Sequence, residues 1–99
     1  MEVDGFDWDE GNLAKCQKHG LSIEEIEALF RKVIQVAPDR RHSDGEERQL
    51  AVGRSTTGRP IFVVFTIRPR DGRTLVRPIS ARYMHAKEIE RYEQAGPSL

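Results

Sequence analysis

The feature of this 99-residue sequence that most restricts its fold is the apolar segment at residues 61–67. The segment is apolar at alternate and at intervening positions, which is typical of a central strand that is buried on both faces. Thr66 interrupts the run, and its length falls far short of the roughly 20 apolar residues that a membrane-spanning helix needs. The chain is therefore expected to build a sheet around this strand and not to enter a membrane.

The residues on either side predict two antiparallel neighbours for this strand. In chain order we expect a strand at 48–54, a hairpin turn at 55–59, the central strand, a turn at 71–72 and a strand at 75–82. Within the first of these strands, Arg48, Leu50, Val52 and Arg54 share one face. Pro78 cannot donate a hydrogen bond to a neighbouring strand, so it predicts a sheet edge or a β-bulge.

Three helices are expected around the sheet. Asp9 is a good N-cap for a helix that runs to about His19, with Gly20 as its stop. Ser22 and Glu25 fit a capping box. The helix that follows has an apolar face, and a last helix spans about 84–94 before Gly96-Pro97; the apolar face consists of Ile26, Leu29, Phe30 and Val33.

The remaining segments complete one domain over residues 1–99. Residues 6–8 predict a short strand or an anchoring segment, residues 33–37 an extended piece, and residues 38–46 a loop. The order of elements indicates an α+β fold, in which a small antiparallel sheet packs with two N-terminal helices and one C-terminal helix.

Charge is unevenly distributed along a chain whose net charge is zero. Residues 1–50 hold 7 basic and 12 acidic residues, whereas residues 51–99 hold 9 basic and 4 acidic ones. Such asymmetry can give a neutral protein a basic face, although the arginines can also be ordinary solvated residues. Cys16 is the only cysteine, and the N-terminus has no signal-peptide pattern, so we expect a cytoplasmic protein.

The first predicted helix carries candidate groups for phosphate chemistry. Lys15, Lys18 and His19 have the spacing i, i+3 and i+4, so they are expected to share a face. Lys18 would neutralise charge and His19 would transfer protons near neutral pH. The alternative is that these cations only interact favourably with the helix dipole.

Arginines from separate strands are the second set of candidates. Arg48 and Arg54 share a strand face, and Arg82 ends the last strand; together they could bind a phosphate and stabilise developing negative charge. Glu47 could act as a base or as a partner of Arg48. The spacings of histidine and cysteine match no common metal motif, so no metal or other cofactor is expected.

Taken together, these segments resemble the BrnT toxin family. The matching stretches are FDWDE at 6–10, KHGLS at 18–22, HSDGEER at 42–48, GRS at 53–55 and ISAR at 79–82, continued by Glu88, Tyr92 and Glu93. The resemblance implies a RelE-like ribonuclease fold and an endoribonuclease that stops translation. It also implies a BrnA-type antitoxin with a ribbon-helix-helix domain, through which the pair would reach DNA.

The mechanism expected from these residues uses the 2′-hydroxyl of RNA as the nucleophile, without a metal. Charge stabilisation falls to Arg48 and Arg82, supported by Lys18, and the base is Glu47 or His19. The residues expected to bind RNA are Lys15, Arg54, Arg77 and His85.

Two other functions stay open on the sequence alone. In the first, the same arginines dock an acidic segment of another protein, and the chain is a binding module without catalytic activity. In the second, the chain binds DNA directly, although its last helix carries Glu88, Glu90 and Glu93 and is not a basic recognition helix.

Overall fold

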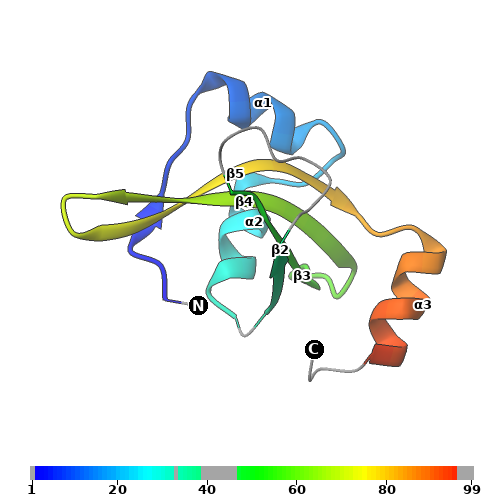
Figure 1. Ribbon diagram of the computed structural model, residues 1–99. Coiled ribbons are helices and arrows are strands. Elements are labelled where there is room, and N and C mark those ends of the chain that lie inside the picture. Colours follow the sequence, from blue (N-terminus) through cyan, green and yellow to red (C-terminus); the bar gives the residue numbers. More distant parts are fainter. Residues whose placement is uncertain (1, 33, 39–46, 96–99) are drawn as a thin grey trace.

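The computed structural model describes residues 2–32, 34–38 and 47–95, and these form a mixed sheet with three helices (Figure 1). The elements in chain order are β1 (Gly5–Phe6), α1 (Glu10–Gln17), α2 (Ile23–Phe30), β2 (Gln35–Pro38), β3 (Gln49–Arg54), β4 (Pro60–Arg70), β5 (Arg73–Tyr83) and α3 (Ala86–Ala95). The predicted α+β class, with two N-terminal helices and one C-terminal helix, is confirmed. Val33, residues 39–46 with His42, and Gly96-Pro97 lie outside the described residues. Pro38, which was predicted to begin a loop, is instead the last residue of β2.

The five described strands have the order β1-β5-β4-β3-β2, so the apolar strand β4 lies at the centre, as predicted. β2, β3, β4 and β5 pair antiparallel, whereas β1 pairs parallel with β5. β4 and β5 form a hairpin whose turn, Asp71-Gly72, has positive φ at both residues. Such a turn matches the twist of the strands that it joins, which explains the predicted hairpin.

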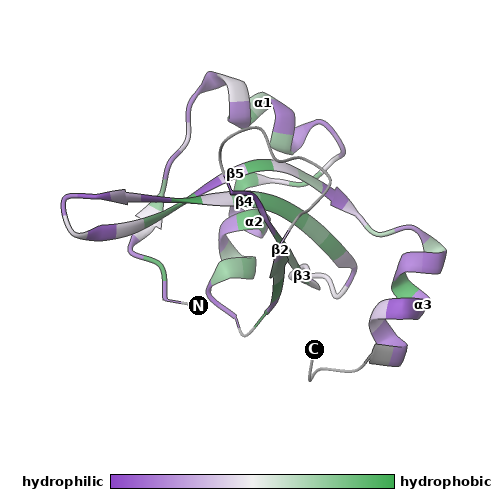
Figure 2. Cartoon of the chain, in the orientation of Figure 1, coloured by the Kyte–Doolittle hydropathy of each residue, from purple (hydrophilic) through white to green (hydrophobic). Residues whose placement is uncertain are grey.

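One face of the sheet is covered by α2 and holds the core. Ser22 caps this helix by accepting a hydrogen bond from the backbone of Glu25, and the apolar side chains that follow point to the sheet. Phe30 lies at the centre, with edge-on ring contacts to Phe6 at 5.9 Å and Phe65 at 4.9 Å between centroids. Figure 2 shows apolar residues along the middle of β4 and β5 and mostly polar residues along α3.

A β-bulge interrupts the pairing of β4 with β5 at Pro78. Phe65 is the partner of Pro78 but Val64 is the partner of Ser80, so Ile79 is the extra residue. The predicted irregularity at Pro78 is confirmed, and its cause is the missing N–H of proline. The bulge changes which side chains of β5 face each side of the sheet.

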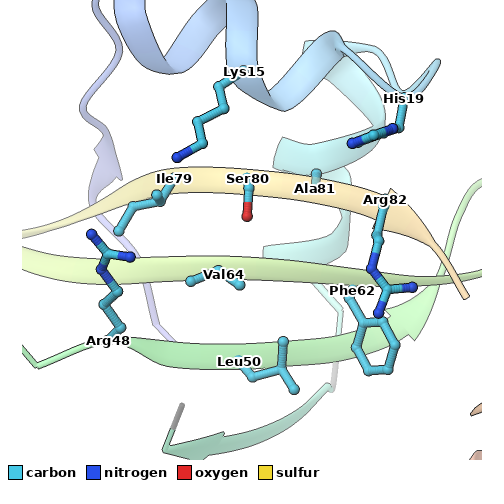
Figure 3. A pocket seen from close by; sticks show the side chains of 10 residues that line it. All are labelled: Lys15, His19, Arg48, Leu50, Phe62, Val64, Ile79, Ser80, Ala81 and Arg82. Carbon is cyan, nitrogen blue, oxygen red and sulfur yellow. The ribbon is translucent and has the colours of Figure 1, made fainter. Parts of the chain in front are cut away.

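α1 packs along β5 and presents different residues to the two faces of the sheet. Cys16 is fully buried in the core, and Asn12 is almost fully buried. The neighbouring positions Lys15 and His19 point over the opposite face of the sheet (Figure 3). No helix in the described part of the chain has the length and apolar character that crossing a membrane requires.

Candidate active-site groove

The sheet face opposite α2 carries an open groove of about 510 Å³ (Figure 3). Its floor is apolar and comes from β3, β4 and β5, while α1 borders one side. The residues that line it are Lys15, His19, Arg48, Leu50, Phe62, Val64, Ile79, Ser80, Ala81 and Arg82. The lining thus combines an apolar floor with basic side chains at the rim.

Four basic residues from separate parts of the chain surround this floor. Lys15 and His19 extend from α1 and the turn after it, Arg48 precedes β3, and Arg82 lies near the end of β5. The lining includes no carboxylate among the described residues. Cations that converge on one concave surface favour an anionic ligand, and guanidinium groups suit phosphate in particular.

Asn12 places α1, and therefore Lys15 and His19, beside the groove. Its side-chain amide donates to the carbonyl oxygens of Asp7, at 2.9 Å, and of Pro78, at 2.8 Å. Its side-chain oxygen accepts the N–H of Asp9 at 2.7 Å, which completes a capping box at the start of α1. The bulge at Pro78 and the first turn of α1 are thereby joined by a buried polar contact.

Arg82 is held in a fixed orientation at the groove end. Its Nη1 and Nη2 donate to the two carboxylate oxygens of Glu88, each at 2.8 Å, and Nη1 also donates to the carbonyl of Tyr83 at 3.2 Å. Its guanidinium carbon lies 4.7 Å from the ring centroid of Phe62. The hydrogen bond to Arg82 lowers the pKa of Glu88 to about 2, and the same bond raises the pKa of Arg82. Both groups are thus ionised near neutral pH.

The structure brings together four of the nine residues that the sequence proposed for the site. Lys15, His19, Arg48 and Arg82 line the groove. Lys18 does not; it is the exposed C-cap residue that follows α1, which ends at Gln17.

The other proposed residues also lie outside the lining. Glu47 is exposed next to Arg48. Arg77 pairs with Asp9 at 2.8 Å and with Asp7 at 3.7 Å, and therefore supports the start of α1. The last two lie towards α3: Arg54 is 3.8 Å from a carboxylate oxygen of Glu93, and the exposed His85 donates its backbone N–H to Glu88.

Sequence reasoning missed several residues of the groove and its surroundings. Phe62 and Ser80 were assigned to strands without a role, yet both line the groove. The signal for Phe62 was present in its alternation with the buried Ile61 and Val63, since alternate residues of a strand face opposite ways. Glu88 was read as part of an acidic helix and of the family motif, without a role in the site, although it binds Arg82.

The fold and the groove define a small α+β protein with a groove bordered by basic side chains. The family model described as "Ribonuclease toxin, BrnT, of type II toxin-antitoxin system" matches residues 8–88. The chain therefore belongs to the BrnT family of ribonuclease toxins, which confirms the resemblance found in its motifs. No curated protein matches the chain.

Proposed function

We propose that this protein is an endoribonuclease toxin that cleaves RNA in the groove and thereby inhibits translation. The observation that carries the proposal is the convergence of Lys15, His19, Arg48 and Arg82 on one groove whose described lining has no carboxylate. Membership of a ribonuclease toxin family supports the choice of RNA among anionic ligands.

The groove has complementary parts for a nucleotide. Its rim provides cations for the phosphate, and its floor provides the apolar side chains of Leu50, Val64 and Ile79 for the sugar and base. Arg48 and Arg82 lie towards opposite ends of this floor (Figure 3), so a phosphate bound over the floor lies between two guanidinium groups. A single-stranded segment suits this open surface better than a duplex, because its bases are free to contact the floor.

The proposed reaction is a transfer of the phosphodiester within the RNA. The 2′-oxygen attacks the adjacent phosphorus, the bond from phosphorus to the 5′-oxygen breaks, and a 2′,3′-cyclic phosphate and a 5′-hydroxyl result. His19 accepts the proton of the 2′-hydroxyl, and solvent, to which the groove is open, protonates the departing 5′-oxygen. Arg48 and Arg82 stabilise the charge of the phosphorane, with Lys15 as a further cation. This route requires no metal ion.

His19 replaces Glu47 as the preferred base in this proposal. Both were candidates from the sequence, but only His19 lines the groove. An imidazole also exchanges protons near neutral pH without a large perturbation, whereas a carboxylate needs one.

The direct test is cleavage of a single-stranded RNA by purified protein in EDTA. Arg48→Ala, Arg82→Ala and His19→Gln are each expected to lower kcat/KM by about 100-fold, the scale of losing one group that stabilises a transition state. Arg70→Ala is the control, since Arg70 is exposed near the tip of the β4–β5 hairpin. A DNA strand of the same sequence should stay intact because it lacks the 2′-hydroxyl.

Each part of the proposal has an outcome that contradicts it. Variants of Arg48 and Arg82 that cleave as fast as the parent would refute the assignment of the groove. Loss of cleavage in EDTA would refute the metal-free route. Binding of RNA without any cleavage would favour a binding module instead of an enzyme.

We further propose a BrnA-type ribbon-helix-helix antitoxin as the partner, with DNA contacted only through it. The family description, which places such toxins in type II pairs, supports this proposal. Co-expression with the protein from the neighbouring reading frame should restore growth and yield a stable complex. Failure of both would contradict the proposed partner without affecting the test of cleavage.

A further inference from the structure

Glu88 joins the groove to α3 through two sets of hydrogen bonds. Its carboxylate accepts two hydrogen bonds from Arg82, both at 2.8 Å, and one from the backbone N–H of His85 at 2.7 Å. The hydrogen bond from the backbone N–H of His85 fixes the carboxylate to the first turn of α3, as in the reciprocal bond of a capping box. The orientation of Arg82 therefore depends on where α3 begins.

Glu88 leaves one side of the Arg82 guanidinium group available. A guanidinium group has an end edge, formed by Nη1 and Nη2, and a side edge, formed by Nε and one Nη; each can bind two oxygens of an anion. Glu88 takes the end edge, and the carbonyl of Tyr83 takes the remaining hydrogen of Nη1. None of the described residues accepts a hydrogen bond from Nε of Arg82, so the side edge can still bind a phosphate.

The ring of Phe62 restricts movement of the Arg82 guanidinium group out of its own plane. The group lies over this ring, with its central carbon 4.7 Å from the ring centroid, so the ring supports the guanidinium plane. The carboxylate fixes the rotation of the group within that plane. Arg82 consequently needs little reorganisation when an anion arrives, which is the condition for effective electrostatic catalysis.

We propose that Glu88 is a positioning residue for the cleavage of RNA, acting through Arg82. It holds the end edge of Arg82 so that the side edge meets the scissile phosphate. This inference rests on the proposed function of the groove. The opposite arrangement, in which Glu88 competes with RNA for Arg82, predicts the opposite change in activity, so experiment separates the two.

The test compares the parent with Glu88→Gln and Glu90→Gln, each also combined with Arg82→Ala. Glu90 is an exposed residue of the same helix, so its variant carries the same loss of charge without the contact to Arg82. Glu88→Gln should lower kcat/KM by about 10- to 100-fold, the scale of losing a residue that orients a metal-binding side chain in metal sites. Glu90→Gln should stay within about twofold of the parent, as an exposed side chain without a structural contact does.

The double variants separate positioning from a merely structural role. If Glu88 acts through Arg82, Glu88→Gln should cause no further loss once Arg82 is alanine. An equal loss in both backgrounds, with thermal unfolding showing that the proteins are folded, would overturn the inference. Unchanged or increased activity of Glu88→Gln in the otherwise native protein would also overturn it.

Binding of a fully 2′-O-methylated RNA distinguishes failure of this inference from failure of the proposed function. If the parent does not cleave RNA, the proposed function is wrong, and the same proteins are compared by their Kd for this uncleavable strand. A weaker affinity for Glu88→Gln that disappears in the Arg82→Ala background supports positioning. Equal affinities of the parent and Glu88→Gln, or no binding by the parent, overturn the inference that Glu88 positions Arg82.

Discussion

Replacement of Asn12 by alanine should cost this protein a large part of its stability. The side chain of Asn12 makes three hydrogen bonds to main-chain groups: the carbonyls of Asp7 and Pro78 and the N–H of Asp9. Asn12 is only 5% exposed, so water cannot readily replace these partners. At roughly 0.5–1.5 kcal/mol for each bond the loss is about 2–4 kcal/mol. Alanine recovers up to about 0.7 kcal/mol of helix propensity, which leaves about 2–3 kcal/mol.

Urea unfolding, followed by circular dichroism, measures this loss directly, and Tm should fall by about 10–20 °C for a chain of this size. Gln17→Ala is the control, because among the described residues the exposed side chain of Gln17 bonds only to the carbonyl of Leu13, within α1. It should change the free energy of unfolding by less than about 0.5 kcal/mol. Asn12→Asp at pH 7 should be at least as unstable as Asn12→Ala, because a carboxylate cannot donate to either carbonyl.

A free energy of unfolding for Asn12→Ala within about 0.5 kcal/mol of the parent would refute this reasoning, since that lies below the contribution of even one such bond. The variant should also bind RNA more weakly than its folded fraction explains. The reason is that Asn12 fixes α1 to the bulge, and α1 carries Lys15 and His19 to the groove.

Three further predictions concern the core and the ion pair. Gly53→Ala should destabilise the protein by about 1–3 kcal/mol in urea unfolding, because an added Cβ would lie 2.5 Å from a methyl carbon of the buried Leu29. Cys16 should react far more slowly with iodoacetamide at pH 8 in the folded protein than in urea, since burial raises its thiol pKa to about 11. Arg82 lowers the pKa of Glu88 to about 2, so the pair stabilises the fold above the ordinary glutamate pKa of about 4.3 and loses this contribution as pH falls towards 2. The difference in unfolding free energy between the parent and Glu88→Gln should therefore shrink by about 1–2 kcal/mol between pH 6 and pH 2.5, a value reduced for partial solvent exposure; a constant difference would contradict it.

Local sequence signals were sufficient wherever the structure depends on residues close in the chain. Asp9 and Ser22 cap their helices as predicted, because a cap joins residues three positions apart. The complete capping box, however, forms between Asp9 and Asn12, whereas the Glu25 carboxylate contacts the Ser22 hydroxyl at 3.3 Å. Pro78 marks the bulge because a single missing N–H is enough to disturb the pairing. The same signals placed the ends of elements less well: α3 begins at Ala86 and not at about residue 84.

Contacts across the fold could not be read from the same signals. Asn12 and Pro78 lie 66 positions apart, and their hydrogen bond depends on how α1 packs against β5. The pair of Arg82 and Glu88 spans the junction of a strand with a helix, and its geometry depends on the direction in which α3 leaves the sheet. The spacing of Lys15, Lys18 and His19 likewise did not show which of the three face the groove, since that depends on how α1 lies on the sheet.

The distribution of acidic residues explains how a chain without net charge keeps a cationic groove. Asp7 and Asp9 lie beside Arg77, and Glu27 accepts the indole N–H of Trp8 at 2.9 Å. Contacts at the start of α1 and on α2 therefore hold these three carboxylates. Within the described part of the chain, no acidic side chain pairs with Lys15, His19 or Arg48.

Arg82 is the one basic residue of the groove lining with a described carboxylate partner, and it binds that partner with the edge that the proposed phosphate contact does not need. The basic lining of the groove therefore reflects where the described acidic residues are held and not an excess of basic residues in the chain. Because the Debye length is about 8 Å at physiological ionic strength, such a local field acts on an anion already near the groove and adds little at long range. Recognition of RNA by this protein must consequently depend on close contacts with the floor and the rim, which is why the orientation of individual side chains such as Arg82 is decisive.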